Sequence, residues 1–399
     1  MSSATSQLTL SPAARMNRIE ISATLAVVNE AEKLRSAGVD LVDFGAGEPH
    51  FGTPQHIREA AIAAIHNNFS KYTAVAGTAE LRDAIAKRHA TDFATDYKRE
   101  EVIASVGGKH ALFNAIQVLV DHGDEVIIPV PYWVSFKDMV QYSGGKPVFV
   151  EADESQNFRL TAAMVEKAVT PKTKLIILNS PSNPSGAVMA PEDMKSIARF
   201  AYERGIWVIS DECYVYLNYT GEEFSLGSLT EVKERLLVVG SLSKTYAMTG
   251  WRLGYTLAPA AVVSQMQKLQ SQSTSNPTSI VQKAAVAALN GPQECVAEMR
   301  ADYIKLRDEI VSGLRSIPGV KCTMPQGAFY AYPDISCAFG KAGMNSAADV
   351  AKKLLHEAHV VSVPGEAFGT TKHIRLSYAA SHENVARGLE RMHKFFASL

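Results

Sequence analysis

The fold class of this 399-residue chain is decided by the stretch KLIILNSPSNPSGAVMAPEDMKSIARFAYERGIWVIS, residues 174–210. Two short apolar runs, KLIILN (Lys174–Asn179) and IWVIS (Ile206–Ser210), flank a segment of helical period, PEDMKSIARFAYERG (Pro191–Gly205). A strand, a helix and a strand at this spacing indicate parallel strands joined by a crossover helix. Runs that are apolar throughout are typical of strands covered on both faces. The stretch therefore predicts an α/β domain.

The same alternation extends outward on both sides of this stretch. Further strands are expected at EVIIPV (Glu125–Val130), KPVFV (Lys146–Val150) and LLVVGS (Leu236–Ser241). Helices are expected over residues 54–68, 108–120 and 262–270, which show the 3.6-residue period. We therefore expect one large domain built on a mostly parallel sheet.

The chain changes character after Ser275. Helical patterns over residues 279–290 and 294–317 lead into strand-rich segments at 320–335, 358–365 and 373–379, and a last helix is expected over 383–398. This order predicts a second, smaller α+β domain. We place the large domain at residues 50–292 and the small domain at residues 1–49 together with 293–399.

Composition excludes several classes of protein. The formal net charge is −1 and 46% of the residues are hydrophobic, so the basic surplus of a nucleic-acid-binding protein is absent. The four cysteines form no C-x-x-C pair, which fits a reducing compartment. The first ten residues lack the basic and apolar regions of a secretory signal, and no long uncharged apolar segment suggests a membrane span. We expect a cytoplasmic protein.

The segment GSLSKTYAMTGWRLGY, residues 240–255, is the most informative for chemistry. Lys244 follows a buried strand, at the edge of the sheet where open α/β folds bind ligands. Partial burial favours the neutral amine that a nucleophilic lysine needs, although a lone lysine is more often a solvated surface residue. Ser241 and Arg252 lie nearby in sequence and offer a hydroxyl and a guanidinium suited to a phosphate.

A glycine pair, Gly107 and Gly108, precedes a predicted helix. The free N–H groups at a helix start bind anions, although a glycine pair at such a turn is often only a turn. Asn183 lies in the turn-rich loop SPSNPSGAV, which is either a ligand-binding loop or a plain connection. Neither a complete dinucleotide fingerprint around Gly45 and Gly47 nor a P-loop occurs.

Two further strand ends carry polar residues. Asp211 and Tyr214 follow IWVIS, where an acid either caps the next helix or contacts a ligand. Arg375 lies within the apolar run HIRLSYA, where an unpaired guanidinium would be costly. Arg375 therefore requires an anionic partner, either a structural carboxylate or that of a substrate.

Taken together and in this order, these motifs resemble the fold-type I pyridoxal phosphate enzymes, and most closely the class I aminotransferases of the bacterial and plastid aspartate aminotransferase subfamily. The resemblance covers nearly the whole chain and rests on LVDFGAGEPHFGTP, KYTAVAGTAELR, SVGGKHALFNA, PYWVSF, SPSNPSGAV, SDECY, SLSKTYAMTGWRLGY, PQGAFY, VPGEAFG and HIRLSY. It implies a large domain with a mostly parallel seven-stranded sheet, a smaller α+β domain and a homodimer with shared active sites.

The resemblance also implies a role for each site residue. Lys244 would be the Schiff-base lysine, Asp211 the partner of the pyridinium nitrogen, and Tyr214 and Asn183 the donors to the cofactor's phenolic oxygen. The phosphate would be held by Ser241, Arg252 and the backbone of Gly107, Gly108 and Lys109, with Tyr72 reaching it from a neighbouring subunit. Trp133 would stack on the ring, and Arg375 would bind the substrate's α-carboxylate beside the backbone of Gly47.

Substrate choice is less defined by the resemblance. The animal-type enzymes bind the distal carboxylate with an arginine, but residues 270–279 contain none. In the resembling subfamily a lysine at the Lys109 position takes this task, helped by hydroxyls near the N-terminus, here Ser22 and Thr24. We expect transfer of the amino group of L-aspartate to 2-oxoglutarate. The alternative is a glutamate- or aspartate-prephenate aminotransferase, or one with broader aromatic specificity, because such relatives carry the same Thr24 and Lys109.

Overall fold

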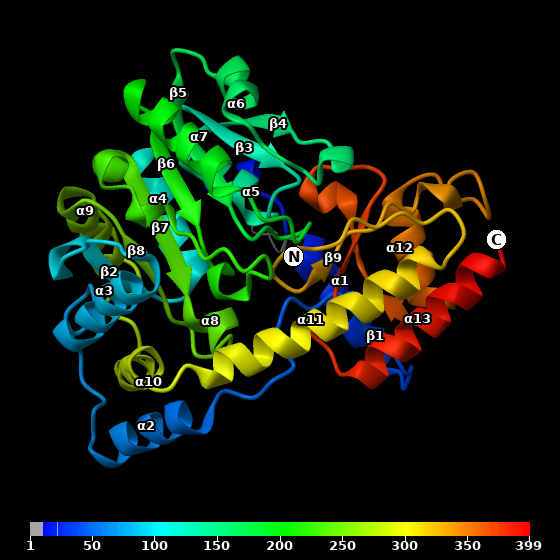
Figure 1. Ribbon diagram of the computed structural model, residues 1–399, viewed down its shortest axis with the longest axis horizontal. Helices are drawn as coiled ribbons and strands as arrows, with labels where there is room; N and C mark the ends of the chain where they lie inside the picture. The colour runs from blue at the N-terminus through cyan, green and yellow to red at the C-terminus, as the bar shows by residue number, and fades with distance from the viewer. Residues whose placement is uncertain (1–10, 22) are drawn as a thin grey trace, which may run out of the picture.

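A seven-stranded sheet runs through the larger part of the molecule, in the strand order β2-β8-β7-β6-β5-β3-β4 (Figure 1). The computed structural model describes residues 11–21 and 23–399. The strands of this sheet are β2 (Val102–Ser105), β3 (Glu125–Val130), β4 (Lys146–Glu151), β5 (Thr173–Asn179), β6 (Trp207–Asp211), β7 (Leu236–Ser241) and β8 (Gly254–Leu257).

Five of these strands are parallel, as the sequence predicts. β4 pairs with β3, β3 with β5, β5 with β6 and β6 with β7, all in parallel register. β8 is antiparallel to both of its neighbours, β7 and β2. A mostly parallel α/β sheet is therefore confirmed.

Both faces of the sheet are covered by helices. Alternate strand residues such as Ile127 and Val238 pack with helices α3, α7 and α10 on one face. Their neighbours Ile128 and Val239 pack with α4, α5 and α9 on the other face. This double coverage explains why the strand sequences are apolar throughout.

The run KPVFV is an exception to that expectation. It forms β4, at the edge of the sheet, where only Val150 is buried and Phe149 is 45% exposed. An edge strand has a neighbouring strand on one side only. Its side chains therefore lack the adjacent side chains that help to bury those of the central strands.

Most strands of the main sheet are joined by helices, and α9, α10 and α11 follow one another without a strand between them. The helices are α1 (Ala23–Ser36), α2 (Gln55–His66), α3 (Ala79–Phe93), α4 (Gly108–Leu119), α5 (Ser135–Ser143), α6 (Ala162–Ala168), α7 (Pro191–Glu203), α8 (Leu242–Thr245), α9 (Ala260–Ser271), α10 (Ser279–Asn290), α11 (Glu294–Arg315), α12 (Ala347–Glu357) and α13 (His382–Ala397). The expected helices at 54–68, 108–120, 191–205, 262–270 and 279–290 are all present within a few residues of the predicted ends.

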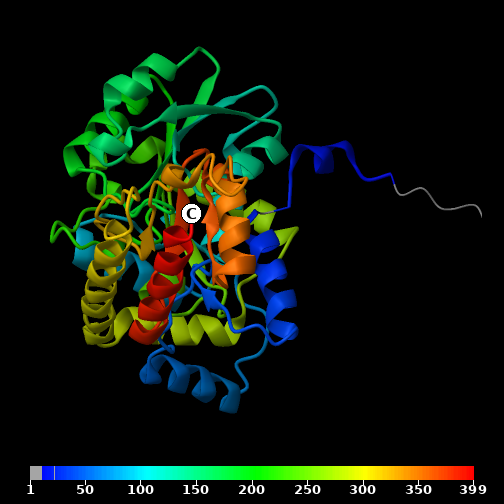
Figure 2. The same ribbon diagram turned by 90° about the vertical axis from the view of Figure 1, so that its right-hand side faces the viewer.

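The C-terminal part of the chain has a core of its own. A small antiparallel sheet in the order β11-β12-β9 packs with α11 and α13, and its strands are β9 (Tyr330–Ala331), β11 (Val363–Pro364) and β12 (Ile374–Ser377). β1 (Val42–Asp43) pairs in parallel with β10 (Val360–Val361), which joins the two ends of the chain. Figure 2 shows α1 beside α12, where Ala31 packs with Leu355 and Val361.

Less strand is present between residues 320 and 335 than the sequence suggests. Within this segment the named strand is β9, and the remaining pairing consists of isolated bridges between Lys321 and Asp334, Asp334 and His373, and Gly327 and Asn218. Pro325 and Gly327 interrupt the segment, because proline lacks the N–H that a ladder requires and glycine weakens a strand. The segment instead folds back against Gly186 through the backbone N–H groups of Gln326 and Gly327.

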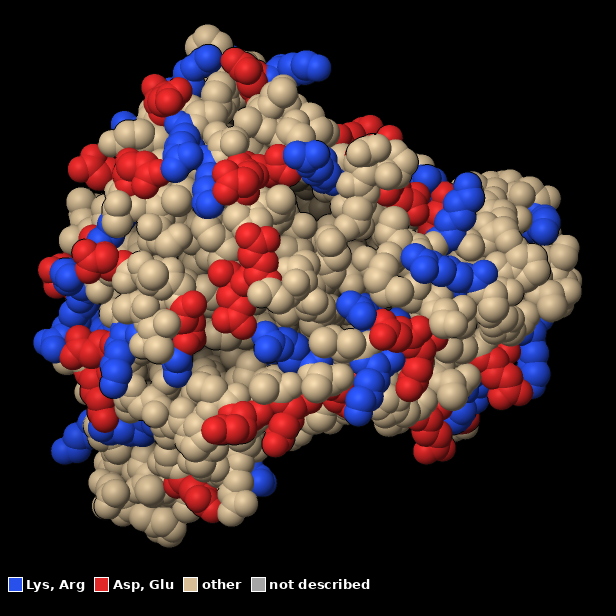
Figure 3. All heavy atoms as spheres, viewed as in Figure 1, with Lys and Arg blue, Asp and Glu red and all other residues tan. Residues whose placement is uncertain are grey.

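Charge on the surface is mixed rather than segregated. Figure 3 shows Lys and Arg interspersed with Asp and Glu over the visible face. Among the described residues, no helix has the length and apolarity needed to cross a membrane. The four cysteines are all free thiols.

Candidate active site

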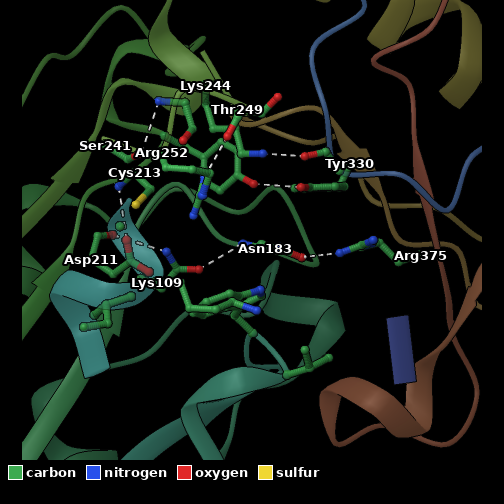
Figure 4. A pocket seen from close by; sticks show the side chains of 18 of the residues that line it. Lys109, Asn183, Asp211, Cys213, Ser241, Lys244, Thr249, Arg252, Tyr330 and Arg375 are labelled. Carbon is green, nitrogen blue, oxygen red and sulfur yellow. Dashed lines mark hydrogen bonds between the residues drawn. The ribbon is translucent and has the colours of Figure 1, made fainter. Parts of the chain in front are cut away.

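The carboxyl ends of the parallel strands open into a cavity of about 460 Å³ between the main sheet and the C-terminal part of the chain (Figure 4). Segments far apart in sequence meet here. Of the predicted site residues, the cavity is lined by Gly47, Gly108, Lys109, Trp133, Asn183, Asp211, Tyr214, Ser241, Lys244, Arg252 and Arg375.

Lys244 lies on the short helix α8, directly after strand β7. Its Nζ atom donates a hydrogen bond to the carbonyl oxygen of Gly47 and lies 5.8 Å from the ring centre of Phe329. Burial lowers the pKa of Lys244 to about 8. The amine is therefore available in its neutral, nucleophilic form far more readily than a solvated lysine.

Asp211 ends strand β6 and is 4% exposed. Its Oδ1 atom accepts a hydrogen bond from the backbone N–H of Cys213 at 3.1 Å. Burial raises the pKa of Asp211 to about 6. Since no Lys or Arg of the described residues pairs with Asp211, this buried carboxyl group suits a ligand that brings a positive N–H group.

The start of helix α4 forms an anion cradle with strand β8. Gly107 has a φ of 86°, and a Cβ atom there would lie 2.3 Å from Nη2 of Arg252. A Cβ atom on Gly254 of β8 would lie 2.3 Å from the backbone nitrogen of Gly108. Glycine is required at both positions, so that a guanidinium and bare N–H groups converge at the helix start.

Ser241 and Arg252 complete this cradle. The Oγ atom of Ser241 caps α8 by accepting from the backbone N–H of Ser243 at 3.1 Å, and it donates to the carbonyl of Leu253. Arg252 donates through Nη1 to the carbonyl of Thr249 at 2.7 Å. No Asp or Glu among the described residues pairs with Arg252, so its charge is available to an anion.

Arg375 lies on β12 and is 2% exposed. It donates through Nη1 to Oδ1 of Asn183 at 2.9 Å and through Nη2 to the carbonyl of Gly45 at 2.8 Å, and Gly47 lines the same cavity. Its guanidinium lies 4.6 Å from the ring centre of Tyr330, and its Nε atom is buried without a partner. Within residues 11–21 and 23–399 no carboxylate neutralises it, which leaves a ligand carboxylate as the anion it requires.

The remaining polar groups point across the same space (Figure 4). The hydroxyl groups of Tyr214 and Tyr330 share a hydrogen bond of 2.7 Å. The Oδ1 atom of Asn183 accepts a hydrogen bond from Arg375, so the amide nitrogen of Asn183 is left for a ligand. Lys109 lies 5.1 Å from the ring centre of Trp133, and burial together with Arg252 lowers the pKa of Lys109.

Of the other predicted residues, the structure places Tyr72 apart from this arrangement and does not describe the side chains of Ser22 and Thr24. Tyr72 lies outside the lining of the cavity and is 92% exposed. Thr24 is part of α1, but its side chain lies outside the described atoms. Ser22 falls outside the described residues.

The comparison with protein families agrees with this geometry. Residues 39–392 match the family described as Aminotransferase class I and II. An aspartate aminotransferase of Geobacillus stearothermophilus is 44% identical over 385 residues, which are 96% of this chain and 98% of that protein. The chain belongs to the class I and II aminotransferases.

Solved structures of this family share the fold of the chain. The aspartate aminotransferase of Thermus thermophilus, solved with maleate, superposes with a TM-score of 0.92 at 41% identity over 97% of this chain and 100% of that one. An aspartate/prephenate aminotransferase of Nitrosomonas europaea is 41% identical over 95% of this chain and 98% of that protein.

Some lining residues of this aminotransferase were not anticipated from the sequence. Cys213 and Tyr330 are examples, and Thr249, Ser243, Leu112 and Val28 also line the cavity. Cys213 stands between Asp211 and Tyr214 in SDECY, and Tyr330 ends PQGAFY, so both lie within motifs that were already singled out. Val28 of α1 carries no chemical signal in the sequence.

Proposed function

We propose that this aminotransferase is a pyridoxal 5′-phosphate-dependent aspartate aminotransferase. It would pass the amino group of L-aspartate to 2-oxoglutarate, giving oxaloacetate and L-glutamate in a ping-pong cycle. The observation that carries this proposal is the combination, in one cavity, of a buried lysine of lowered pKa with cations that no carboxylate neutralises. The names of relatives at 41–44% identity support aspartate as the substrate.

The residues present fit the cofactor. The N–H groups of Gly107, Gly108 and Lys109, with Ser241 and Arg252, offer the donors and charge that a phosphate needs. Asp211 offers the buried carboxylate that a protonated ring nitrogen needs, and Trp133 offers an aromatic face. When bound, pyridoxal phosphate supplies an aldehyde for the amino group and a ring that takes up negative charge from the substrate.

Lys244 performs two tasks in this proposal. Lys244 would hold the cofactor covalently through its neutral amine, which the lowered pKa makes available near neutral pH. With substrate bound, its free Nζ atom would take the proton from the substrate's Cα atom. The same atom would then return that proton to the cofactor's C4′ carbon, as a general base and acid within one cavity.

Three neighbours tune and orient this chemistry. Asp211, once ionised, keeps the ring nitrogen protonated through a charge-assisted hydrogen bond. Tyr214 and the amide of Asn183 would donate to the cofactor's phenolic oxygen. Both are nine-tenths or more buried, so they act in a site from which water is largely excluded.

Two cations select a dicarboxylate. Arg375 would bind the α-carboxylate, close to the Gly45–Gly47 backbone. Lys109 would meet the distal carboxylate, and the Thr24 hydroxyl would assist it as in the resembling subfamily. Because one mobile ammonium group discriminates less sharply than a bidentate guanidinium, several acceptors should be tolerated.

The quaternary and domain arrangement belongs to the same proposal. The enzyme would be a cytoplasmic homodimer in which Tyr72 reaches the phosphate site of the neighbouring subunit. The exposure of the Tyr72 side chain supports the homodimer, and the four free thiols support the cytoplasmic location. Residues 50–292 would form the cofactor-binding domain, and residues 1–49 with 293–399 would form the small domain.

A second candidate function is transamination of prephenate or aromatic 2-oxo acids. It is favoured by Lys109 in the cavity and by the aspartate/prephenate relative. The deciding experiment compares kcat/KM for oxaloacetate, 2-oxoglutarate, prephenate and phenylpyruvate side by side. Preference for the two dicarboxylate acceptors supports the first proposal, whereas preference for prephenate or phenylpyruvate would replace it.

A further inference from the structure

The loop between α2 and α3, residues 67–78, carries Tyr72 at the surface, and in Figure 1 it runs along the left edge of the molecule. Tyr72 is 92% exposed, and its hydroxyl has no hydrogen-bond partner within the described part of the chain. An exposed aromatic side chain usually sits on a loosely held segment. This loop is instead tied down by two buried glutamines.

Gln282 lies in the first turn of α10 and is fully buried. Its Nε2 atom donates to Oγ1 of Thr73 at 2.9 Å and to the carbonyl of Pro277 at 2.7 Å. Its Oε1 atom accepts from the backbone N–H of Thr78 at 2.8 Å. One side chain therefore holds the loop on both sides of its Ala74–Gly77 turn.

Gln270 lies in the last turn of α9 and is also fully buried. Its Nε2 atom donates to the carbonyls of Val75 at 2.8 Å and Ala104 at 2.9 Å. Its Oε1 atom accepts from Oγ of Ser105 at 2.7 Å and from Nδ2 of Asn114 at 3.1 Å. Gln270 thereby joins the Tyr72 loop to the end of strand β2 and to helix α4, whose start forms the anion cradle of the same subunit.

Burying two amides in this way is costly unless every polar atom is paired. Each glutamine pairs with at least one residue that follows Tyr72 in the loop, and none of the paired residues lines the cavity. We propose that Gln282 and Gln270 are positioning residues, which fix the loop so that Tyr72 enters the anion cradle of a second copy of this chain. This inference rests on the proposed homodimer and deepens it, because it assigns these glutamines to the site of the neighbouring subunit.

The test uses hybrid dimers purified through two different affinity tags. One subunit carries Lys244→Ala, so the absorbance band of the lysine-linked cofactor reports only the other, live site. Gln282→Met is placed either on the Lys244→Ala subunit or on the live subunit, and the affinity of the live site for pyridoxal phosphate is titrated. Thr73→Val, which removes one acceptor with little change of shape, repeats the test, and Thr91→Val on α3 is the matched control.

On the Lys244→Ala subunit, Gln282→Met should weaken binding at the live site about tenfold, the scale of one or two lost hydrogen bonds. Thr73→Val should act in the same direction with a smaller factor. Either variant on the live subunit, and Thr91→Val on either subunit, should leave that affinity within about twofold of wild type.

Three results would overturn the inference, and they are distinguishable. Equal weakening whichever subunit carries the variants would show a merely structural role. Suppose that Tyr72→Phe on the Lys244→Ala subunit weakens cofactor binding at the live site, but Gln282→Met and Thr73→Val do not. The positioning role is then wrong, and the Tyr72 proposal stands. If Tyr72→Phe has no such effect, the proposed role of Tyr72 fails together with the inference.

Discussion

At the scale of single residues, the cavity divides substrate recognition between two cations of different chemistry. Arg375 is buried, planar and held by two hydrogen bonds, to Asn183 and Gly45. Lys109 is a single ammonium group over Trp133. Arg375 is suited to the α-carboxylate, which every amino acid shares. Lys109 is suited to a side-chain carboxylate, which only some amino acids carry.

Arg375→Lys should therefore lower kcat/KM for all amino donors by a similar factor. The loss should be about 10- to 100-fold, because one charge-assisted hydrogen bond contributes roughly 1.5–3 kcal/mol. Steady-state kinetics with aspartate and with phenylalanine check this. A loss confined to aspartate would contradict the assignment of Arg375 to the α-carboxylate.

Lys109→Met should act selectively. Without the ammonium group, KM for aspartate and oxaloacetate should rise about tenfold or more, while KM for phenylalanine and phenylpyruvate changes little. The same assays measure both pairs. Equal effects on the two pairs would remove Lys109 from the recognition of the distal carboxylate.

The pKa of Lys244 gives a prediction for the protein without its cofactor. Because burial lowers this pKa to about 8, the fraction of neutral amine rises as the pH passes through about 8 and then levels off. The rate of covalent combination with pyridoxal phosphate should follow the same curve. A solvated lysine of pKa ~10.4 would still be gaining reactivity above pH 9.

That experiment has an internal control. Pyridoxine phosphate has no aldehyde, so its binding should lack this dependence on the Lys244 amine. A combination rate that keeps rising to pH 10 would show that the lysine is not desolvated in the folded protein.

At the scale of elements, the close contact of strand β8 with the start of α4 sets the shape of the anion cradle. Gly254→Ala would place Cβ 2.3 Å from the nitrogen of Gly108 and 2.5 Å from the carbonyl carbon of Gly107. Because both are backbone atoms, the helix start must move. We expect the free energy of unfolding to fall by about 2 kcal/mol and pyridoxal phosphate to bind more weakly.

Urea denaturation of the cofactor-free protein and a spectral titration measure these two effects. Gly52→Ala is the control, since nothing lies within 4 Å of the Cβ atom it would add. If Gly254→Ala behaves like Gly52→Ala, the close approach of the two backbones does not shape the cradle.

Elements differ in how well the sequence predicts them. Strands β3, β5, β6 and β7 were predicted within a residue or two, because burial on both faces leaves an apolar run that turn residues interrupt. The bounds of the edge strand β4 were predicted equally well, but its exposure was not, and segment 320–335 has less strand than predicted, because burial and pairing there depend on neighbours distant in sequence. The polar residues of the cavity could be predicted because they follow predicted strands. Val28 and the Tyr214–Tyr330 contact could not, because they depend on segments that are distant in sequence.

At the scale of the whole molecule, the cavity lies between the main sheet and the C-terminal core. Arg375 reaches Asn183 from the C-terminal side, and Lys244 reaches Gly47 from the side of the main sheet. A dicarboxylate bound to Arg375 and Lys109 would add contacts across this boundary. We therefore predict that the small sheet moves toward the main sheet when a dicarboxylate such as succinate binds.

Crystal structures of the pyridoxal phosphate-loaded protein with and without succinate measure this movement. The angle between the two sheets should differ between them. Identical angles would show that the two parts form one rigid body during catalysis.

The transfer of an amino group through Lys244 is tested most directly by an absorption spectrum. Wild-type protein loaded with pyridoxal phosphate should show a visible band that aspartate removes and 2-oxoglutarate restores, whereas Lys244→Ala should show neither that exchange nor measurable transamination. A loaded wild type with no visible band, or a Lys244→Ala variant that still turns over aspartate and 2-oxoglutarate, would contradict the proposed function.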